Sequence, residues 1–111
     1  MYGRFHKLHH EYTIAVTVCT EFNHPVEFIL SNILPVGVGV MIMGGRIHYY
    51  GYLSWIFVRV LKATEVHCGY VFPWSPYSLF KPFVDASFHD YHHLYNVGNY
   101  GAFTNIWDTL F

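Results

Sequence analysis

The chain has 111 residues, enough for one ordinary domain, and 53% of them are hydrophobic, 21% aromatic and only 12% charged. Average proteins carry about 25% charged residues, so this composition indicates a membrane protein. A net charge of −1 with six lysines and arginines excludes the basic surface of a nucleic-acid-binding protein. The two cysteines are far apart and form no C-x-x-C motif, and we expect Cys19 to be a small buried hydrophobic residue.

Histidines concentrate in a five-residue pattern, H-x-x-H-H, that occurs near both ends of the chain, at residues 6–10 and 89–93. On a helix, positions i, i+3 and i+4 share a face, so each pattern predicts a stripe of three imidazoles. Two facing stripes would supply six neutral nitrogen ligands, enough for two metal ions. Imidazole suits iron, zinc, copper and nickel, so the ligands alone do not identify the metal.

A first apolar segment covers residues 26–45 and has no charged residue after Glu27. At about 1.5 Å per residue, a helix of this length crosses a hydrocarbon core of about 30 Å. Pro35 in its middle predicts a kink, which a membrane tolerates where neighbouring groups satisfy the freed carbonyl. The alternative is a buried helical hairpin of a soluble protein. It is disfavoured, because so short a chain has little other structure that could cover such a hairpin.

A second segment runs from residue 49 to about residue 66, after a short glycine-containing turn. It begins with tyrosines and a tryptophan typical of a membrane-interface belt, and Arg59 and Lys62 near its far end could extend to the headgroups. The two segments predict an antiparallel transmembrane hairpin over about residues 26–66. His48 in its turn then lies at the opposite membrane face, and we do not expect it to bind a metal.

The hairpin returns the chain to the side that it left, so the histidine motifs at 6–10 and 67–93 share one compartment. Five of the six basic residues lie on that side, which the positive-inside rule assigns to the cytosol. The predicted fold is therefore an all-α integral membrane helical bundle, with a transmembrane hairpin and a cytosolic histidine-rich metal-binding cap.

Five motifs, in this order and spacing, resemble the fatty acid hydroxylase/sterol desaturase superfamily and, within it, the C4-methyl sterol oxidases. They are His6-Lys7-Leu8-His9-His10-Glu11-Tyr12, Glu21-Phe22-Asn23-His24-Pro25-Val26-Glu27, His67-Cys68-Gly69-Tyr70 with Phe72-Pro73-Trp74, His89-Asp90-Tyr91-His92-His93, and Asn99-Tyr100-Gly101 with Trp107-Asp108. The resemblance covers nearly the whole chain, which makes residues 1–111 a partial fatty acid hydroxylase domain.

The resemblance implies a multi-pass enzyme of the endoplasmic reticulum membrane with a di-iron site on its cytosolic face, for which zinc could substitute. Such an enzyme uses O2, and electrons commonly delivered through cytochrome b5 and its reductase, to hydroxylate an unactivated C–H bond of a lipid substrate. Breaking that bond requires a redox metal, because side chains alone cannot supply the chemistry.

The family pattern suggests seven metal ligands: His6, His9, His10, His67, His89, His92 and His93. His24 belongs to the pattern as well, but capping the first membrane segment is as plausible for it as metal binding. Ligating imidazoles usually donate their other nitrogen to a carboxylate or carbonyl, and we expect Glu11, Asp90 and Asp108 as such partners. The plain alternative for these three is a solvated surface carboxylate.

Members of the family also carry an H-x-x-x-H pattern upstream of the first H-x-x-H-H, and the five residues before His6 do not contain it. We therefore expect the C-terminal part of a hydroxylase domain, either a gene-model fragment or a degenerate relative. The predicted substrate is a sterol C4-methyl group, with fatty acyl, sphingoid or alkane chains as alternatives. A different class is a non-catalytic membrane protein that keeps the fold, with or without a structural metal. A soluble haem or zinc protein is disfavoured, since C-x-x-C-H and H-E-x-x-H motifs are missing.

Overall fold

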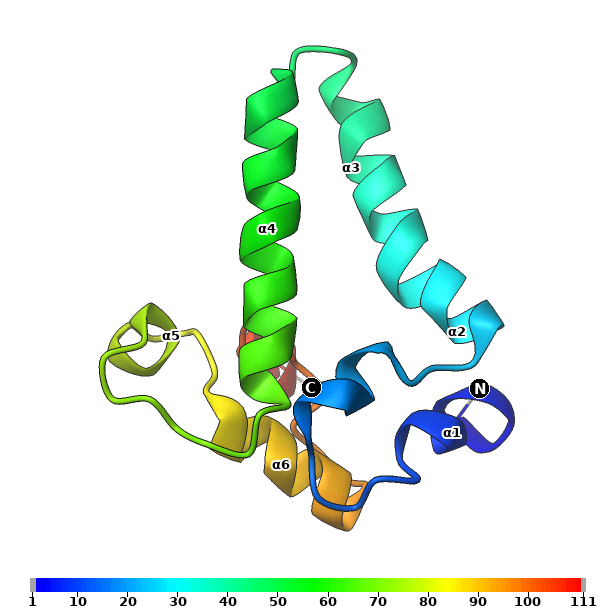
Figure 1. Cartoon of the computed structure of the whole chain (residues 1–111), viewed down its shortest axis with the longest axis vertical. Coiled ribbons are helices and arrows are strands. Elements are labelled where there is room, and N and C mark those ends of the chain that lie inside the picture. Colours follow the sequence, from blue (N-terminus) through cyan, green and yellow to red (C-terminus); the bar gives the residue numbers. More distant parts are fainter. Residues whose placement is uncertain (1, 111) are drawn as a thin grey trace.

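Two long antiparallel helices stand on a base of short helices and loops in the computed structural model, which describes residues 2–110 (Figure 1). Among these residues there is no β-strand, and one isolated bridge pairs Phe83 with Thr104, so the all-α prediction is confirmed. The elements are a π-helix at Tyr2–His6, α1 at Lys7–His9, a 3-10 helix at Thr17–Glu21, α2 at Pro25–Phe28, a π-helix at Ile29–Ile33, α3 at Leu34–Met43, α4 at Tyr49–Val66, α5 at Pro76–Leu79, α6 at Ala86–Tyr95 and α7 at Ile106–Leu110.

The first long helix is continuous from Pro25 to Met43 and is made of α2, the second π-helix and α3. His24 caps its start, where Nδ1 accepts a hydrogen bond of 3.2 Å from the backbone N–H of Val26. Pro35 lies at the beginning of α3, directly after the π-helical turn. A π-turn inserts an extra residue into the helical ladder, so the predicted irregularity at the proline takes the form of a widened turn rather than a break.

The two long helices form the predicted hairpin. Gly44 and Gly45 turn the chain with φ of +57° and +74°, values that glycine adopts without strain, and His48 then caps α4. Lower in the hairpin, Nη2 of Arg59 on α4 donates to the carbonyl oxygen of Ser31 (3.1 Å) and to Oδ1 of Asn32 (2.8 Å). The helices are therefore joined by a turn at one end and by a polar bridge towards the other.

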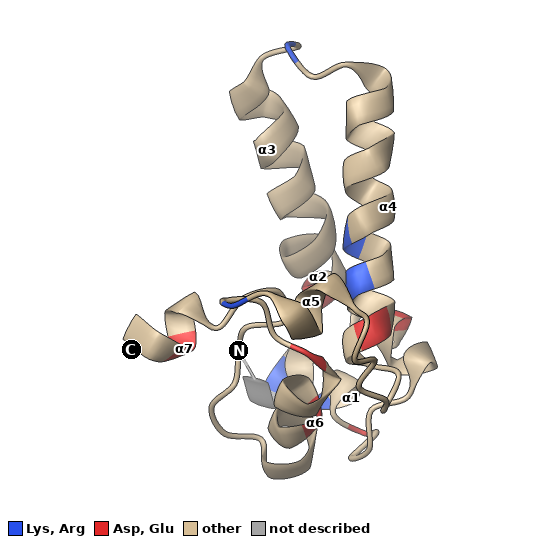
Figure 2. Cartoon of the chain, turned by 90° about the vertical axis from the view of Figure 1, so that its left-hand side faces the viewer, with Lys and Arg blue, Asp and Glu red and all other residues tan. Residues whose placement is uncertain are grey.

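Pro25–Met43 is the one helix in the described part of the chain that is both long and apolar enough to cross a membrane. Almost none of its apolar window is buried, which argues against the core helix of a soluble protein. Figure 2 shows the acidic residues and most basic residues gathered towards the base, and most of the hairpin uncharged apart from its tip. α4 is long enough but carries three charged residues and does not meet the same criterion, so its membrane crossing stays a prediction.

At the base, the end of α4 packs against the N-terminal segment and α6. Lys62 is buried there; its Nζ donates to the carbonyl oxygen of Val84 and lies 4.2 Å from the centre of the Tyr77 ring. The expectation that Lys62 extends to lipid headgroups is therefore wrong. Cys19 is fully buried, as predicted, close to the point where Thr20 bonds to the carbonyl of Ala63 at 3.4 Å. These contacts bring the C-terminal end of α4, and His67 after it, next to the other histidines.

Candidate metal centre

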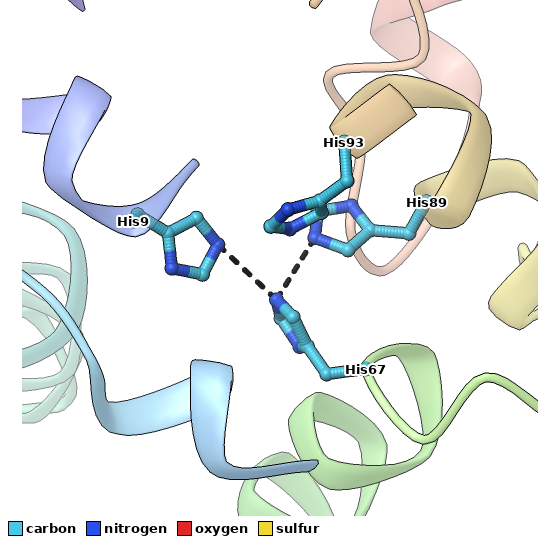
Figure 3. Close-up of side chains that lie close together, drawn as sticks. All are labelled: His9, His67, His89 and His93. Atoms are coloured by element: carbon cyan, nitrogen blue, oxygen red, sulfur yellow. Dashed lines mark hydrogen bonds between the residues drawn. The ribbon is translucent and has the colours of Figure 1, made fainter. Parts of the chain in front are cut away.

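Seven histidines gather at the base of the hairpin in two groups. In the first cluster, each of His9, His67, His89 and His93 contributes one nitrogen, and these four atoms lie within 4.8 Å of one another (Figure 3). All four side chains are buried. The second cluster consists of His6, His10 and His92 and has the same spacing. The seven positions are the seven suggested as ligands from the sequence, and the structure brings them together, whereas His24 and His48 lie outside both clusters.

Each cluster combines residues from both ends of the chain, which the sequence did not predict. The first cluster takes one histidine from the N-terminal motif, two from the C-terminal motif, and His67 from between them. The clusters adjoin each other, because the rings of His10 and His93 stack with their centroids 4.5 Å apart. The arrangement is therefore one continuous patch of imidazoles with two places where nitrogens converge.

α6 presents the C-terminal motif on a well-capped helix. The Asp85 carboxylate accepts hydrogen bonds from the backbone N–H groups of Ser87 (3.0 Å) and Phe88 (3.4 Å), and Asn96 ends the helix in the left-handed region with φ of +56°. The N-terminal motif is less regular than predicted. His6 closes a π-helix and His10 caps the three-residue α1, although the His10 N–H still bonds to the His6 carbonyl at 3.3 Å.

Distances between nitrogens in the clusters fit a shared cation. Nε2 of His67 lies 3.2 Å from Nε2 of His9 and 3.0 Å from Nε2 of His89. In the second cluster, Nε2 of His10 is 2.8 Å from Nε2 of His6. Two nitrogens bound at about 2.1 Å to one ion, at right angles, are about 3.0 Å apart. The spacing of these imidazole nitrogens therefore suits a bound metal ion of the kind that the family resemblance implies.

Three of the imidazoles are held in the tautomer that a metal ligand needs. Their Nδ1 atoms donate to backbone carbonyls, so each Nε2 keeps its lone pair. The pairs are His67 with Ala63 (2.7 Å), His92 with Gly98 (2.8 Å) and His93 with Tyr12 (3.1 Å). Nε2 of His93 is buried and has no hydrogen-bond partner among the described residues. A buried lone pair without a donor is the feature that a bound cation would satisfy.

Burial and mutual repulsion keep these histidines neutral. Burial, followed by the neighbouring imidazoles, lowers the pKa of His9 to about 3 and that of His89 to about 2. The same causes lower the pKa of His10 to about 4, and also that of His93, although its bond to the Tyr12 carbonyl opposes the shift. At neutral pH each of these side chains therefore keeps one unprotonated ring nitrogen, whose lone pair can bind a metal ion.

Glu27 is a site residue that sequence analysis missed. Its Oε1 is hydrogen-bonded to Nδ1 of His6, and its side chain is buried. It lies in the quoted Glu21–Glu27 motif, three residues after His24, but the sequence analysis assigned it no role. Its presence in an apolar segment was the available signal, because a carboxylate within a membrane helix usually has a specific partner.

The three carboxylates that were expected as imidazole partners occupy other places. Glu11 is exposed, and Oδ1 of the half-buried Asp90 is buried without a partner among the described residues. Asp108 accepts hydrogen bonds from the backbone N–H groups of Tyr100 (2.7 Å) and Gly101 (2.8 Å). It therefore fixes the loop whose Tyr100 ring lies 5.1 Å from that of His92.

A cavity of about 930 Å³ opens onto both clusters. Histidines line one end, and the walls continue between the long helices to Pro35 and Val60. Phe103 in the C-terminal loop and Trp107 on α7 line another side. Its volume lies within the range of small-molecule sites, and it joins the imidazole patch to the apolar hairpin.

Comparison with known proteins finds relatives over nearly the whole chain. The chain is 32% identical to "Methylsterol monooxygenase erg25B" of Aspergillus fumigatus, over 99% of this chain and 38% of that protein. It is 36% identical to "Methylsterol monooxygenase 1" of Danio rerio, over 100% of this chain and 37% of that protein. It is also 36% identical to "Very-long-chain aldehyde decarbonylase GL1-11" of Oryza sativa subsp. indica, over 100% of this chain and 42% of that protein.

The chain thus spans about two fifths of the length of these curated relatives. No solved structure matches it significantly. The family model described as fatty acid hydroxylase matches residues 1–111, and the resemblance seen in the motifs is confirmed. The chain belongs to the fatty acid hydroxylase family.

Proposed function

We propose that this chain forms the histidine-rich part of a membrane oxygenase that hydroxylates a C–H bond of a lipid with iron and O2. One observation carries the proposal: seven imidazoles, most of them kept neutral by burial, converge in two adjoining clusters at the end of a cavity that reaches an apolar hairpin. The named methylsterol monooxygenases make a sterol C4-methyl group the first substrate candidate. Fatty acyl, sphingoid and alkane chains are the alternatives, and an aldehyde decarbonylase among the relatives keeps the substrate class open.

The first cluster would hold one iron ion through His9, His67, His89 and His93. The second would hold another through His6, His10 and His92. Bound iron supplies the activation of O2 that side chains cannot provide, whereas zinc would fill the same nitrogens without redox chemistry. The protein itself would hold the Nδ1–H groups of three imidazoles in hydrogen bonds to backbone carbonyls. It would also exclude water through burial and place the lipid in the cavity.

The hairpin supplies the route for the lipid. We propose that both long helices cross the endoplasmic reticulum membrane and that the histidines lie at its cytosolic face. The cavity walls rise between these helices, so a lipid can reach the clusters from the bilayer without crossing water. Cytochrome b5 and its reductase, as electron donors, would approach from the cytosolic side.

The test uses the full chain in detergent or native membranes, with His9→Ala and His92→Ala as one variant for each cluster. Each should lower metal affinity by about 10–100-fold, because the remaining nitrogens cannot complete the coordination. Iron content by mass spectrometry and product formation from a methylsterol, with cytochrome b5 and its reductase, are measured together. His48→Ala, at the hairpin turn and outside both clusters, is the matched control and should be silent.

Unchanged iron content and turnover in both variants would reject the assignment of the clusters. Metal that is lost from the variants, while the wild type turns over no sterol, acyl, sphingoid or alkane substrate, would instead support the non-catalytic alternative with a structural metal. Product analysis with a methylsterol and a fatty acid side by side separates the substrate classes.

A further inference from the structure

We infer that Glu27 is a positioning residue that holds His6 in the tautomer and orientation that the second metal cluster requires. The inference rests on the proposed function in one respect, namely that the clusters bind metal ions. It goes further, because it makes metal binding by the second cluster, but not by the first, depend on Glu27 at the start of the first long helix.

Glu27 is placed by the rigid start of the first long helix. His24 caps this helix, Pro25 occupies its first turn, and the N–H of Phe28 bonds to the His24 carbonyl at 2.9 Å. The carboxylate is therefore fixed in the first turn, where a negative charge is favourable, and it faces the N-terminal segment rather than solvent. The chain separates Glu27 from His6 by 21 positions, so this contact is made by the fold.

His6 is the histidine in the second cluster whose Nδ1 is held by a side chain. Nδ1 of His92 in the same cluster is held by a backbone carbonyl instead. With the carboxylate on Nδ1, the proton of His6 stays there and Nε2 faces Nε2 of His10, 2.8 Å away. A carboxylate on the outer nitrogen of a ligating imidazole fixes the tautomer and the orientation of the ring.

The second oxygen of Glu27 argues against a purely structural ion pair. Oε2 is buried and has no hydrogen-bond partner among the described residues, and Glu27 lines the cavity. A carboxylate that only fastened the N-terminal segment would gain from pairing both oxygens, since an unsatisfied buried oxygen costs free energy. Phe5 and His24, with rings 4.9 Å apart, already fasten this segment independently.

The experiment titrates the full chain in detergent with cobalt(II) and follows stoichiometry and the visible absorption spectrum. The variants are Glu27→Ala and Glu27→Gln. Glu21→Gln is the matched control, a carboxylate that is exposed although it borders the same cavity. We expect two ions per chain in the wild type and in the control. Glu27→Ala should keep the ion of the first cluster and weaken the other by about 10–100-fold, with a changed spectrum. Glu27→Gln retains an acceptor oxygen and should recover part of the loss.

A double-mutant cycle sharpens the result. In a His6→Ala background, Glu27→Ala should cause no further loss of cobalt, because the carboxylate acts through that imidazole. The inference is overturned if Glu27→Ala binds both ions as the wild type does, or if it loses both ions together with a fall in melting temperature. A wild type that binds a single ion would overturn it too. Normal two-ion binding without lipid turnover would refute the proposed function and leave this inference standing.

Discussion

Leu34→Arg tests whether the first long helix crosses a membrane. Leu34 lies at the middle of the helix Pro25–Met43 and its side chain is 50% exposed. At the centre of a membrane helix, arginine costs about 2.5–3.5 kcal/mol for insertion and the lost leucine adds about 0.5 kcal/mol. The sum of about 3–4 kcal/mol lowers the insertion equilibrium by a factor of several hundred, at 1.4 kcal/mol per factor of ten. On a water-exposed helix the same substitution would change stability by no more than about 0.5 kcal/mol.

Insertion is measured in microsomes with a flexible glycosylation acceptor placed between Gly44 and Gly45 at the hairpin tip. The wild type should be glycosylated and Leu34→Arg should not. Met41→Arg is the control, because Met41 is 79% exposed close to the helix end, where arginine can reach the headgroups and the cost is small. Equal glycosylation of all three proteins would refute the membrane-spanning assignment.

Three further outcomes are expected. A cysteine at position 48, in place of His48, and the native Cys68 should react with an impermeant maleimide from opposite sides of the membrane; labelling from one side would contradict the hairpin topology. Gly101→Ala should destabilise the fold by about 1–3 kcal/mol in thermal unfolding, because an added Cβ would clash with the carbonyl oxygen of Thr104, so an unchanged melting temperature would be contrary to the structure. The metal-free protein should lose stability as pH falls from about 7 to 4, because unfolded histidines with pKa near 6.5 take up protons that the buried ones, such as His9, do not; a flat melting temperature over this range would disagree.

Local sequence patterns were sufficient to predict the hairpin and α6. The apolar run, the Gly44-Gly45 turn and the aromatic start of α4 act within a few residues, and the H-x-x-H-H spacing indicated the helical stripe that α6 carries. The π-helical turn before Pro35 was not predictable, since the spacing of apolar side chains is almost the same in a helix with or without one inserted residue. The burial of Lys62 depends on Val84 and Tyr77, which reach it only through the fold.

In the candidate site, too, some features followed from the sequence and others depend on the fold. The shared H-x-x-H-H spacing identified six of the seven cluster members, and the family resemblance added His67. Neither predicted how the histidines divide between the two clusters, which depends on how α6 packs against the N-terminal segment. The acceptors of three Nδ1 protons are backbone carbonyls, and every residue carries one, so no sequence pattern marks them. Adjacency in the chain favoured Glu11 and Asp90, whereas the fold selected Glu27 across 21 positions.

If the hairpin crosses the membrane as proposed, the mixing of motifs in each cluster makes assembly of the clusters depend on how the hairpin is inserted. His9 meets His93, and His6 meets His92, only when the chain before the first long helix and the chain after the second are on the same side of the membrane. A chain whose second helix failed to cross would leave His67 and α6 on the far side, with four of the seven nitrogens missing. Neither cluster could then assemble, so under this proposal metal binding and the correct topology would be acquired in the same step of biogenesis.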